Sequence, residues 1–418
     1  MSLSYKTPSY FSSFSCLGSD CEDTCCRNWE VKLDRQHYEL LNNTMSKEHN
    51  EKSLFEQYVH LNENSISSDH DYAFIRMGVN GYCAMLDDKG LCSIHDKYGV
   101  APMGDVCTMF PRVISRCKDT IELSGALSCP EVVRECIDDK TPLKIKRFKP
   151  ADLPRSKNYP IQREISKNDN EYFEKFELVR ETMMKIIANE KHDFETRLYV
   201  VANLVNKISS FYHRACQNSD AEQLDSILLS VTNDEFVSKL DLVVKDLTPD
   251  TSITMVVVHS ILSIKLQQAE NENISQLYKS IIDKLNITDD NVVSELSNLI
   301  TNTSGSLSNE NRAYIEKALT RYMINCLYRE WFVSMPDPFT YFQMLLVRIT
   351  ILRSLIYLDI ITKNNIEQHE LKQRMVYIMY NFARDVDQNL EFLKVIYSAL
   401  SEQSMMNFDF SPIFIRLN

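Results

Sequence analysis

The residues best suited to chemistry in this chain are cysteines in its first third. Four lie within eleven residues and four more follow, as Cys16, Cys21, Cys25, Cys26, Cys83, Cys92, Cys107 and Cys129. Thiolate is a soft ligand that suits zinc and iron–sulfur clusters, and either centre commonly takes four thiolates. We therefore predict that these eight cysteines are metal ligands, enough for one four-thiolate site with spare residues or for two complete sites.

The spacing of the first four cysteines matches neither of two common metal motifs. It is Cys-x4-Cys-x3-Cys-Cys, whereas zinc ribbons use pairs of Cys-x2-Cys. It also differs from the Cys-x3-Cys-x2-Cys triad of radical enzymes, because Cys26 directly follows Cys25. The side chains of adjacent residues diverge, so we expect Cys25 and Cys26 to have different roles.

The alternative interpretation of a cysteine is a small buried hydrophobe. We prefer it for Cys117, Cys136, Cys216 and Cys326. Ten of the twelve cysteines precede residue 137, which is not the distribution expected if disulfides stabilised the whole fold. The first residues, Met-Ser-Leu-Ser-Tyr-Lys-Thr-Pro, lack the apolar core of a signal peptide. We therefore expect a cytoplasmic protein with reduced thiols.

Charge and hydropathy argue against two classes of partner. The net charge of −12 is unfavourable for binding nucleic-acid phosphates. The most apolar stretch, 339–361, carries Gln343, Arg348, Arg353 and Asp359, which are costly in hydrocarbon. We predict a buried amphipathic helix there rather than a membrane span, and expect neither nucleic acid nor a membrane as a partner.

Glycine and proline divide the chain into three parts. Seven of the eight glycines lie at or before Gly125, so residues 1–140 are predicted to form a loop-rich, cysteine-rich metal domain with a few short strands. Residues 141–168 are predicted to be a linker or an extended strap, because four prolines fall there. Residues 169–418 carry apolar residues at three- and four-residue spacings, which predicts a large all-helical domain and a mostly α fold.

Local sequence patterns predict the strands, turns and helices around the cysteine motifs and along the rest of the chain. Alternating residues predict strands at 29–34 and 72–77, and 35–58 is predicted helical with a polar interruption. Residues 82–92 read thiol, turn, thiol, and Pro130 places Cys129 at a helix N-terminus. The later helices are predicted at 172–188, 194–215, 220–244, 252–268, 274–285, 292–300, 309–331, 338–362, 369–386 and 389–401.

Four motifs around the cysteines share their order with a known family. They are Phe14-Ser-Cys-Leu-Gly-Ser-Asp-Cys-Glu-Asp-Thr-Cys-Cys-Arg-Asn-Trp29, Cys83 to His95, Asp105 to Arg112, and Leu127 to Glu131. In these the chain resembles the flagellin lysine-N-methylase family and, more broadly, small proteins described as zinc- or iron-chelating domains. Weaker similarity occurs at Tyr328-Arg-Glu-Trp331 and at 381–391, where Asp387 or Gln388 stands in place of an expected histidine.

The resemblance implies a protein lysine N-methyltransferase that moves a methyl group from S-adenosylmethionine to flagellin, with a 4Fe–4S cluster taking part. Composition and spacing indicate only a reduced, thiol-rich metal site. The chain has no Gly-x-Gly, so a Rossmann-type cofactor site is not expected. The cofactor is expected against the cluster or in a cleft between the two halves.

Methyl transfer to an amine requires a neutral lysine and a group that accepts its proton. Candidates near the cysteine motifs are Asp20, Glu22, Asp23, Asp34, Tyr82, Asp105 and Glu131, and the sequence does not choose among them. We interpret His95 as a hydrogen-bonded structural residue and Trp29 as a core residue beside the cluster. Arg112 either offsets the charge of the thiolates or pairs with a carboxylate.

Two other hypotheses remain open. The chain could be a zinc-binding structural protein whose helical domain binds a partner, which colour and metal content would distinguish from an iron–sulfur enzyme. An iron–sulfur electron carrier is disfavoured, because a carrier does not need the long helical part.

Overall fold

The chain forms two compact units, which we describe separately. Unit 1 comprises Met1–Val132 and Leu143–Glu164, and unit 2 comprises Val133–Pro142 and Ile165–Asn418. The chain therefore leaves unit 1 briefly and returns to it before entering the long helical part. The computed structural model describes residues 3–27, 31–63, 69, 71–78, 81–155, 159–165, 175–212, 218–248, 250–288, 290–330, 337–363 and 366–417.

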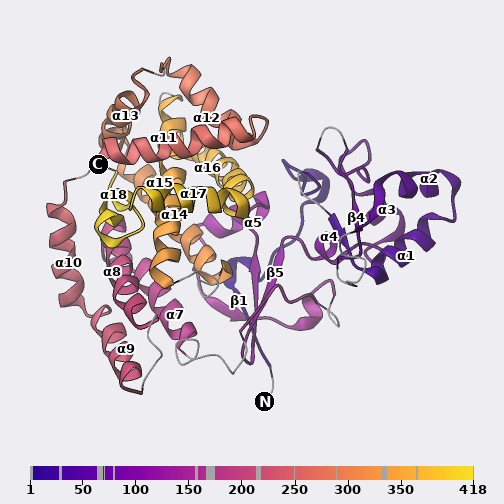
Figure 1. The fold of residues 1–418 in the computed structure, drawn as a ribbon, viewed down its shortest axis with the longest axis horizontal. Coiled ribbons are helices and arrows are strands. Elements are labelled where there is room, and N and C mark those ends of the chain that lie inside the picture. The colour runs from indigo at the N-terminus through magenta and orange to yellow at the C-terminus, as the bar shows by residue number, and fades with distance from the viewer. Residues whose placement is uncertain are drawn as a thin grey trace. The chain divides into compact units, whose positions relative to one another are not determined.

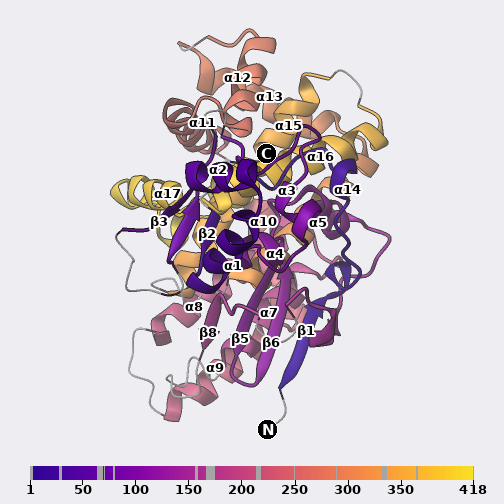
Figure 2. The same ribbon diagram turned by 90° about the vertical axis from the view of Figure 1, so that its right-hand side faces the viewer.

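Unit 1 contains a five-stranded sheet with the order β7-β1-β6-β5-β8. Strand β1 runs parallel to β6, and β5 pairs with β6 as an antiparallel hairpin. Figure 2 shows β1, β6, β5 and β8 side by side. The stretch predicted as a linker supplies both edge strands. The strands are β1 (Ser4–Pro8), β5 (Arg112–Cys117), β6 (Thr120–Gly125), β7 (Ile145–Arg147) and β8 (Arg163–Ile165).

A smaller antiparallel sheet in unit 1 has the order β2-β4-β3. Its strands alternate as expected: Val31 and Leu33 are buried while Lys32 is exposed. Both strands predicted between residues 29 and 77 are confirmed, and the helical stretch predicted at 35–58 forms two helices that are separated at its polar interruption. These elements are β2 (Val31–Leu33), α1 (Arg35–Met45), α2 (His49–Tyr58), β3 (Val59–Leu61), β4 (Ala73–Ile75), α3 (Ser93–Tyr98) and α4 (Asp105–Met109).

Unit 2 is a helical assembly, which confirms the predicted mostly α fold. Helix α5 (Pro130–Ile137) begins in unit 1 and ends in unit 2. The other helices are α7 (Phe176–Ile187), α8 (Phe194–Tyr212), α9 (Asn218–Ser230), α10 (Asp234–Asp246), α11 (Thr251–Gln268), α12 (Asn273–Lys284), α13 (Val292–Ser306), α14 (Asn309–Glu330), α15 (Pro338–Ile361), α16 (Gln368–Phe382), α17 (Leu390–Glu402) and α18 (Ser411–Ile415).

Helix α15 lies at the centre of unit 2, in contact with α8, α13, α14, α16 and α18 (Figure 1). Every residue from Pro338 to Ile360 is buried. The prediction of a buried helix is therefore confirmed, but its amphipathic character is wrong, because neighbours cover all its faces. In the described part of the chain, no helix is long and apolar enough to cross a membrane on its own.

Two predicted helix boundaries are wrong. The single helix predicted at 220–244 is broken, and α10 starts anew after Asn233, whose side chain accepts hydrogen bonds from the N–H groups of Glu235 and Phe236. The helix predicted at 292–300 is longer in the structure, where α13 continues through Gly305 to Ser306. One glycine in a helix costs only about 1 kcal/mol, which packing of the buried face can offset.

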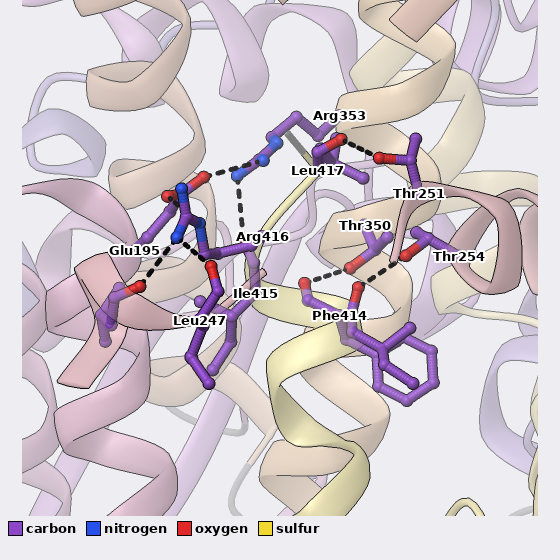
Figure 3. A network of polar contacts seen from close by, with 12 residues as sticks. Glu195, Leu247, Thr251, Thr254, Thr350, Arg353, Phe414, Ile415, Arg416 and Leu417 are labelled. Carbon is purple, nitrogen blue, oxygen red and sulfur yellow. Dashed lines mark hydrogen bonds and ion pairs between the residues drawn. The ribbon is translucent and has the colours of Figure 1, made fainter. Parts of the chain in front are cut away.

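Residues 413–417 are tied to four helices by a polar network (Figure 3). Thr350 of α15 donates to the carbonyl of Phe414 at 2.6 Å, and Thr254 of α11 donates to that of Ile413 at 2.8 Å. Arg353 and Arg416 both pair with Glu195 of α8. These contacts connect the C-terminal residues to α8, α10, α11 and α15.

Candidate functional site

The structure separates the eight predicted metal ligands into two groups, both in unit 1. Within each group, the charge on one thiolate raises the pKa of neighbouring thiols. None of the eleven cysteines in the described residues is part of a disulfide. The five-thiol group consists of Cys25, Cys26, Cys83, Cys92 and Cys107, and the three-thiol group consists of Cys16, Cys21 and Cys129.

The first two segments of the five-thiol group are joined through the backbone. The N–H of Cys83 donates to the carbonyl of Cys26 at 2.9 Å. The thiol–turn–thiol prediction for 82–92 is confirmed, since Leu86 pairs with Cys92 across a turn in which Gly90 has a φ of 75°. Asp87 fixes this turn by accepting the N–H of Leu91 at 2.8 Å.

Cys107 lies on helix α4 and is the remaining member of the five-thiol group. The residue before this helix, Gly104, packs so tightly on β2 that an added Cβ would lie 2.8 Å from the Leu33 side chain and 2.9 Å from the Lys32 carbonyl. Cys83 belongs to the hydrophobic core beneath the smaller sheet, and Cys26, Cys92 and Cys107 pack against it. Cys25 is exposed and lies on the solvent side of the group.

Backbone amides point at several of these sulfur atoms. Cys83 accepts from Met85, and Cys92 accepts from Ile94 and His95 at the start of α3. In the three-thiol group, Cys129 accepts from the first turn of α5 and Cys21 from Asp23. Such hydrogen bonds favour the thiolate, which is the form that binds metals.

Without a cation, the mutual repulsion of thiolates opposes ionisation. Burial is the main cause that raises the pKa of Cys83, Cys92 and Cys107, and neighbouring thiolates raise it further. Burial likewise raises the pKa of Cys129 to about 12. A metal cation bound among these sulfurs would lower the pKa of the thiols, because its charge would stabilise the thiolates.

The spacing of the sulfurs distinguishes between kinds of metal centre. In the described residues, no three of the eight thiols have sulfur atoms within 4.8 Å of one another. A single tetrahedral zinc with ligands at about 2.3 Å would hold its sulfurs roughly 3.8 Å apart. A cluster separates its thiolates more widely, because each binds a different iron. In the described residues, the five thiols are therefore not arranged as the ligand shell of a single zinc ion.

The three-thiol group lies beside Arg112, the first residue of β5. Cys16 and Cys129 act on this guanidinium, although burial lowers its pKa on balance. Arg112 also lies 5.2 Å from the ring centroid of Phe14. Two backbone hydrogen bonds hold Cys129 close to Arg112. The N–H of Cys129 donates to the carbonyl of Ala126, and the N–H of Ala126 donates to the carbonyl of Pro111 at 2.8 Å. This placement supports the interpretation that Arg112 offsets thiolate charge.

The predicted proton acceptors do not gather in one place. Asp23 accepts the N–H of Thr24, Glu131 lies in the first turn of α5, and Tyr82 stacks under Arg27 at 5.4 Å. Asp34 and Asp105, in contrast, line one cavity of about 480 Å³ together with His37 and Arg155. Trp29 and Cys216 lie outside the described residues.

Sequence analysis missed His37 and Arg155. The signal for His37 was present, since Asp34 caps α1 and an aspartate followed three residues later by a histidine places both side chains at one helix start. Arg155 carried no such signal. It is brought in from a distant segment by an ion pair of 2.7 Å with Asp105.

In unit 2 the two weaker motifs meet in a buried polar network. Arg348 of α15 binds both carboxylate oxygens of Glu330, at 3.1 and 2.7 Å, and pairs with Asp387 at 3.4 Å. Tyr322 donates to Asp387 at 2.5 Å. Asp387 ends a π-helical turn, η5 (Ala383–Asp387). Burial raises the pKa of Asp387 on balance, and the guanidinium of Arg348 opposes this rise.

One family model matches most of the helical unit. The model of the FliB lysine N-methylase C-terminal domain covers residues 180–411, which is more than half of the chain. Both members of the buried network that belong to the weaker motifs, Glu330 and Asp387, fall within it.

Curated relatives match a shorter stretch. The lysine-N-methylases of Salmonella typhimurium and Salmonella choleraesuis are each 27% identical over 138 residues, which is 33% of this chain and 33% of each relative. Flagellar biosynthetic protein FliU of Salmonella muenchen is also 27% identical over 138 residues, 33% of this chain and 79% of that protein. The matched stretch thus spans about a third of the two lysine-N-methylases. No solved structure matches.

Proposed function

Because the chain belongs to the FliB lysine N-methylase family, we propose that it is a protein-lysine N-methyltransferase that uses S-adenosylmethionine and acts on flagellin. This membership confirms the predicted family. The observation that carries the proposal is the family match over the helical unit. The flagellar name of one relative supports the choice of substrate.

We further propose that a 4Fe–4S cluster is held by Cys25, Cys83, Cys92 and Cys107. All six pairs among these four thiols act on one another electrostatically. We leave Cys26 out of this set because its thiol hydrogen bonds to Cys25. This choice gives the adjacent cysteines different roles, one as ligand and one as hydrogen-bond donor to that ligand.

When bound, such a cluster supplies a redox-active, Lewis-acidic centre. The residues of the chain supply its environment. The exposed Cys25 leaves the solvent side of the group open, while the core behind Cys83 keeps its other side dry. Methyl transfer itself joins the lysine nitrogen to the methyl carbon as the carbon–sulfur bond of the sulfonium breaks, and the nitrogen releases a proton.

The proposal is tested by incubating anaerobically purified protein with S-adenosylmethionine and flagellin. We expect lysine mass shifts in multiples of one methyl group, and a brown protein that contains iron. Cys117→Ser is the matched control for serine substitutions of the proposed ligands, because Cys117 is buried in β5 and lies outside both thiol groups. Iron-loaded protein that adds no methyl group would contradict the proposed activity. A colourless protein with one zinc per chain would favour the zinc-binding interaction protein.

A further inference from the structure

The cavity beside α1 is built entirely from unit 1. Its lining joins the start of α1 to the start of α4 and to Arg155. Its lining contains four carboxylates, two guanidinium groups, an amide and an imidazole. They belong to Asp34, Glu39, Asp69 and Asp105, to Arg35 and Arg155, to Gln36 and to His37. The same α4 that carries Asp105 also carries Cys107, so the cavity and the five-thiol group share a helix.

The centre of this cavity is an aspartate–histidine pair. Asp34 accepts the backbone N–H of His37 at 2.9 Å with one oxygen, and its other oxygen is hydrogen bonded to Nδ1 of the His37 ring. His37 is 7% exposed, and its Nε2 has no hydrogen-bonding partner among the described residues. With Nδ1–H donated to the carboxylate, Nε2 is the basic nitrogen of the ring.

The charge of the lining favours a cation. Arg155 pairs with Asp105 at 2.7 Å, and Arg35 pairs with Asp69 at 3.2 Å. Within the described lining, the carboxylates of Asp34 and Glu39 are then left without a guanidinium. An entering ammonium group would meet this net negative charge beside the unused nitrogen of His37.

We propose that this cavity receives the lysine side chain of the protein substrate and that Nε2 of His37 accepts its proton. The inference rests on the proposed function, which supplies the sulfonium methyl donor. The ammonium loses one proton to Nε2, and the imidazolium that forms is stabilised by Asp34. The neutral amine then takes the methyl group. Asp105, held by Arg155, positions the opposite wall.

His37→Gln tests the proposal, because glutamine keeps the size and polarity of the side chain but cannot take up the proton. We expect the methylation rate to fall by about 100-fold or more at neutral pH. The rate of the variant should rise with pH as the lysine loses its proton to solvent, and added imidazole should partly restore His37→Ala. Iron content should equal that of the wild type.

His60→Gln is the matched control, since His60 lies in the same unit and its ring contacts the backbone carbonyl of Gln57 at 3.1 Å. Its rate should equal that of the wild type. A His37→Gln enzyme within about twofold of the wild-type rate would overturn the inference and leave the methylase intact. Loss of metal from His37→Gln would also overturn it, because the cavity would then be a metal site. If the wild type transfers no methyl group, the proposed function and this inference fail together.

Discussion

Cys25 and Cys26 are neighbours in the chain but differ in what surrounds their sulfur atoms. Cys25 is exposed and interacts with all four other thiols of its group. Cys26 is half-buried, and its backbone rather than its sulfur connects the two loops, through the hydrogen bond from Cys83. The expectation that adjacent cysteines have different roles thus becomes a specific assignment.

Exchange of each sulfur for oxygen tests that assignment. Cys25→Ser is expected to lose most of the bound iron and the absorption near 400 nm, because a serine replaces one of four thiolates. Cys26→Ser should keep its iron, since a hydroxyl can still donate to Cys25. Iron analysis and absorption spectra of both variants, prepared side by side, provide the measurement. Equal retention, or loss in Cys26→Ser alone, would show that the ligand set is wrong.

Residue types showed where the chemistry lies, but not which residues work together. The cysteines stood out because their density is unusual in a reduced protein. Their division into five and three could not be predicted, because it depends on how loops around Cys21, Cys83 and Cys129 fold onto two different sheets. The partnership of Asp105 with Arg155 is equally non-local, and no spacing along the chain indicates it.

At the scale of elements, local periodicity predicted the helices well and several strands poorly. Helix α15 was predicted nearly to its ends, because its apolar residues and the proline at its start are local signals. Strand β1 was missed, since its partner β6 lies more than a hundred residues away and pairs with it in parallel. The edge strands β7 and β8 lie in a proline-containing stretch, which resembles a linker when considered alone.

The π-helical turn η5 joins two helices through a buried carboxyl group. Asp385 accepts the N–H of Ile274 in the first turn of α12 at 3.0 Å. Burial raises the pKa of Asp385 to about 6, although the hydrogen bond from Ile274 opposes this rise. The folded state therefore binds more protons than the unfolded state between about pH 4 and 6. Stability must then fall as the pH rises through this window.

Asp385→Asn should remove this dependence, since an amide keeps the hydrogen bond to Ile274 without ionising. Relative to the wild type, we expect the variant to gain up to about 3 kcal/mol in free energy of unfolding at pH 7.5, and little near pH 4. Urea unfolding of both proteins at several pH values measures the difference. Asp283→Asn, an exposed change on α12, is the control and should follow the wild-type curve. Parallel curves for Asp385→Asn and the wild type would contradict the argument.

At the scale of the whole molecule, we expect the two units to depend on different sources of stability. Unit 2 has a continuous core around α15, and the buried Arg348 of that helix is paired with Glu330 and Asp387. Unit 1 has short strands and helices, and its loops at 16–26 and 82–92 carry most of the predicted ligands. We expect the proposed cluster to supply part of the stability of this unit, because metal binding and folding are coupled.

Removal of the metal should therefore weaken one unit and spare the other. We expect thermal unfolding to show two transitions, and a chelator under reducing conditions to lower the first midpoint by about 10 °C or more while leaving the second in place. Hydrogen exchange followed by mass spectrometry should show faster exchange in unit 1, including strands β2 and β4, and no change in α15. Cys83→Ser provides the control, since a protein that never bound the cluster should not respond to the chelator. An equal shift of both transitions would mean that the metal stabilises the chain as one cooperative body, and the division of stability between the units would then be wrong.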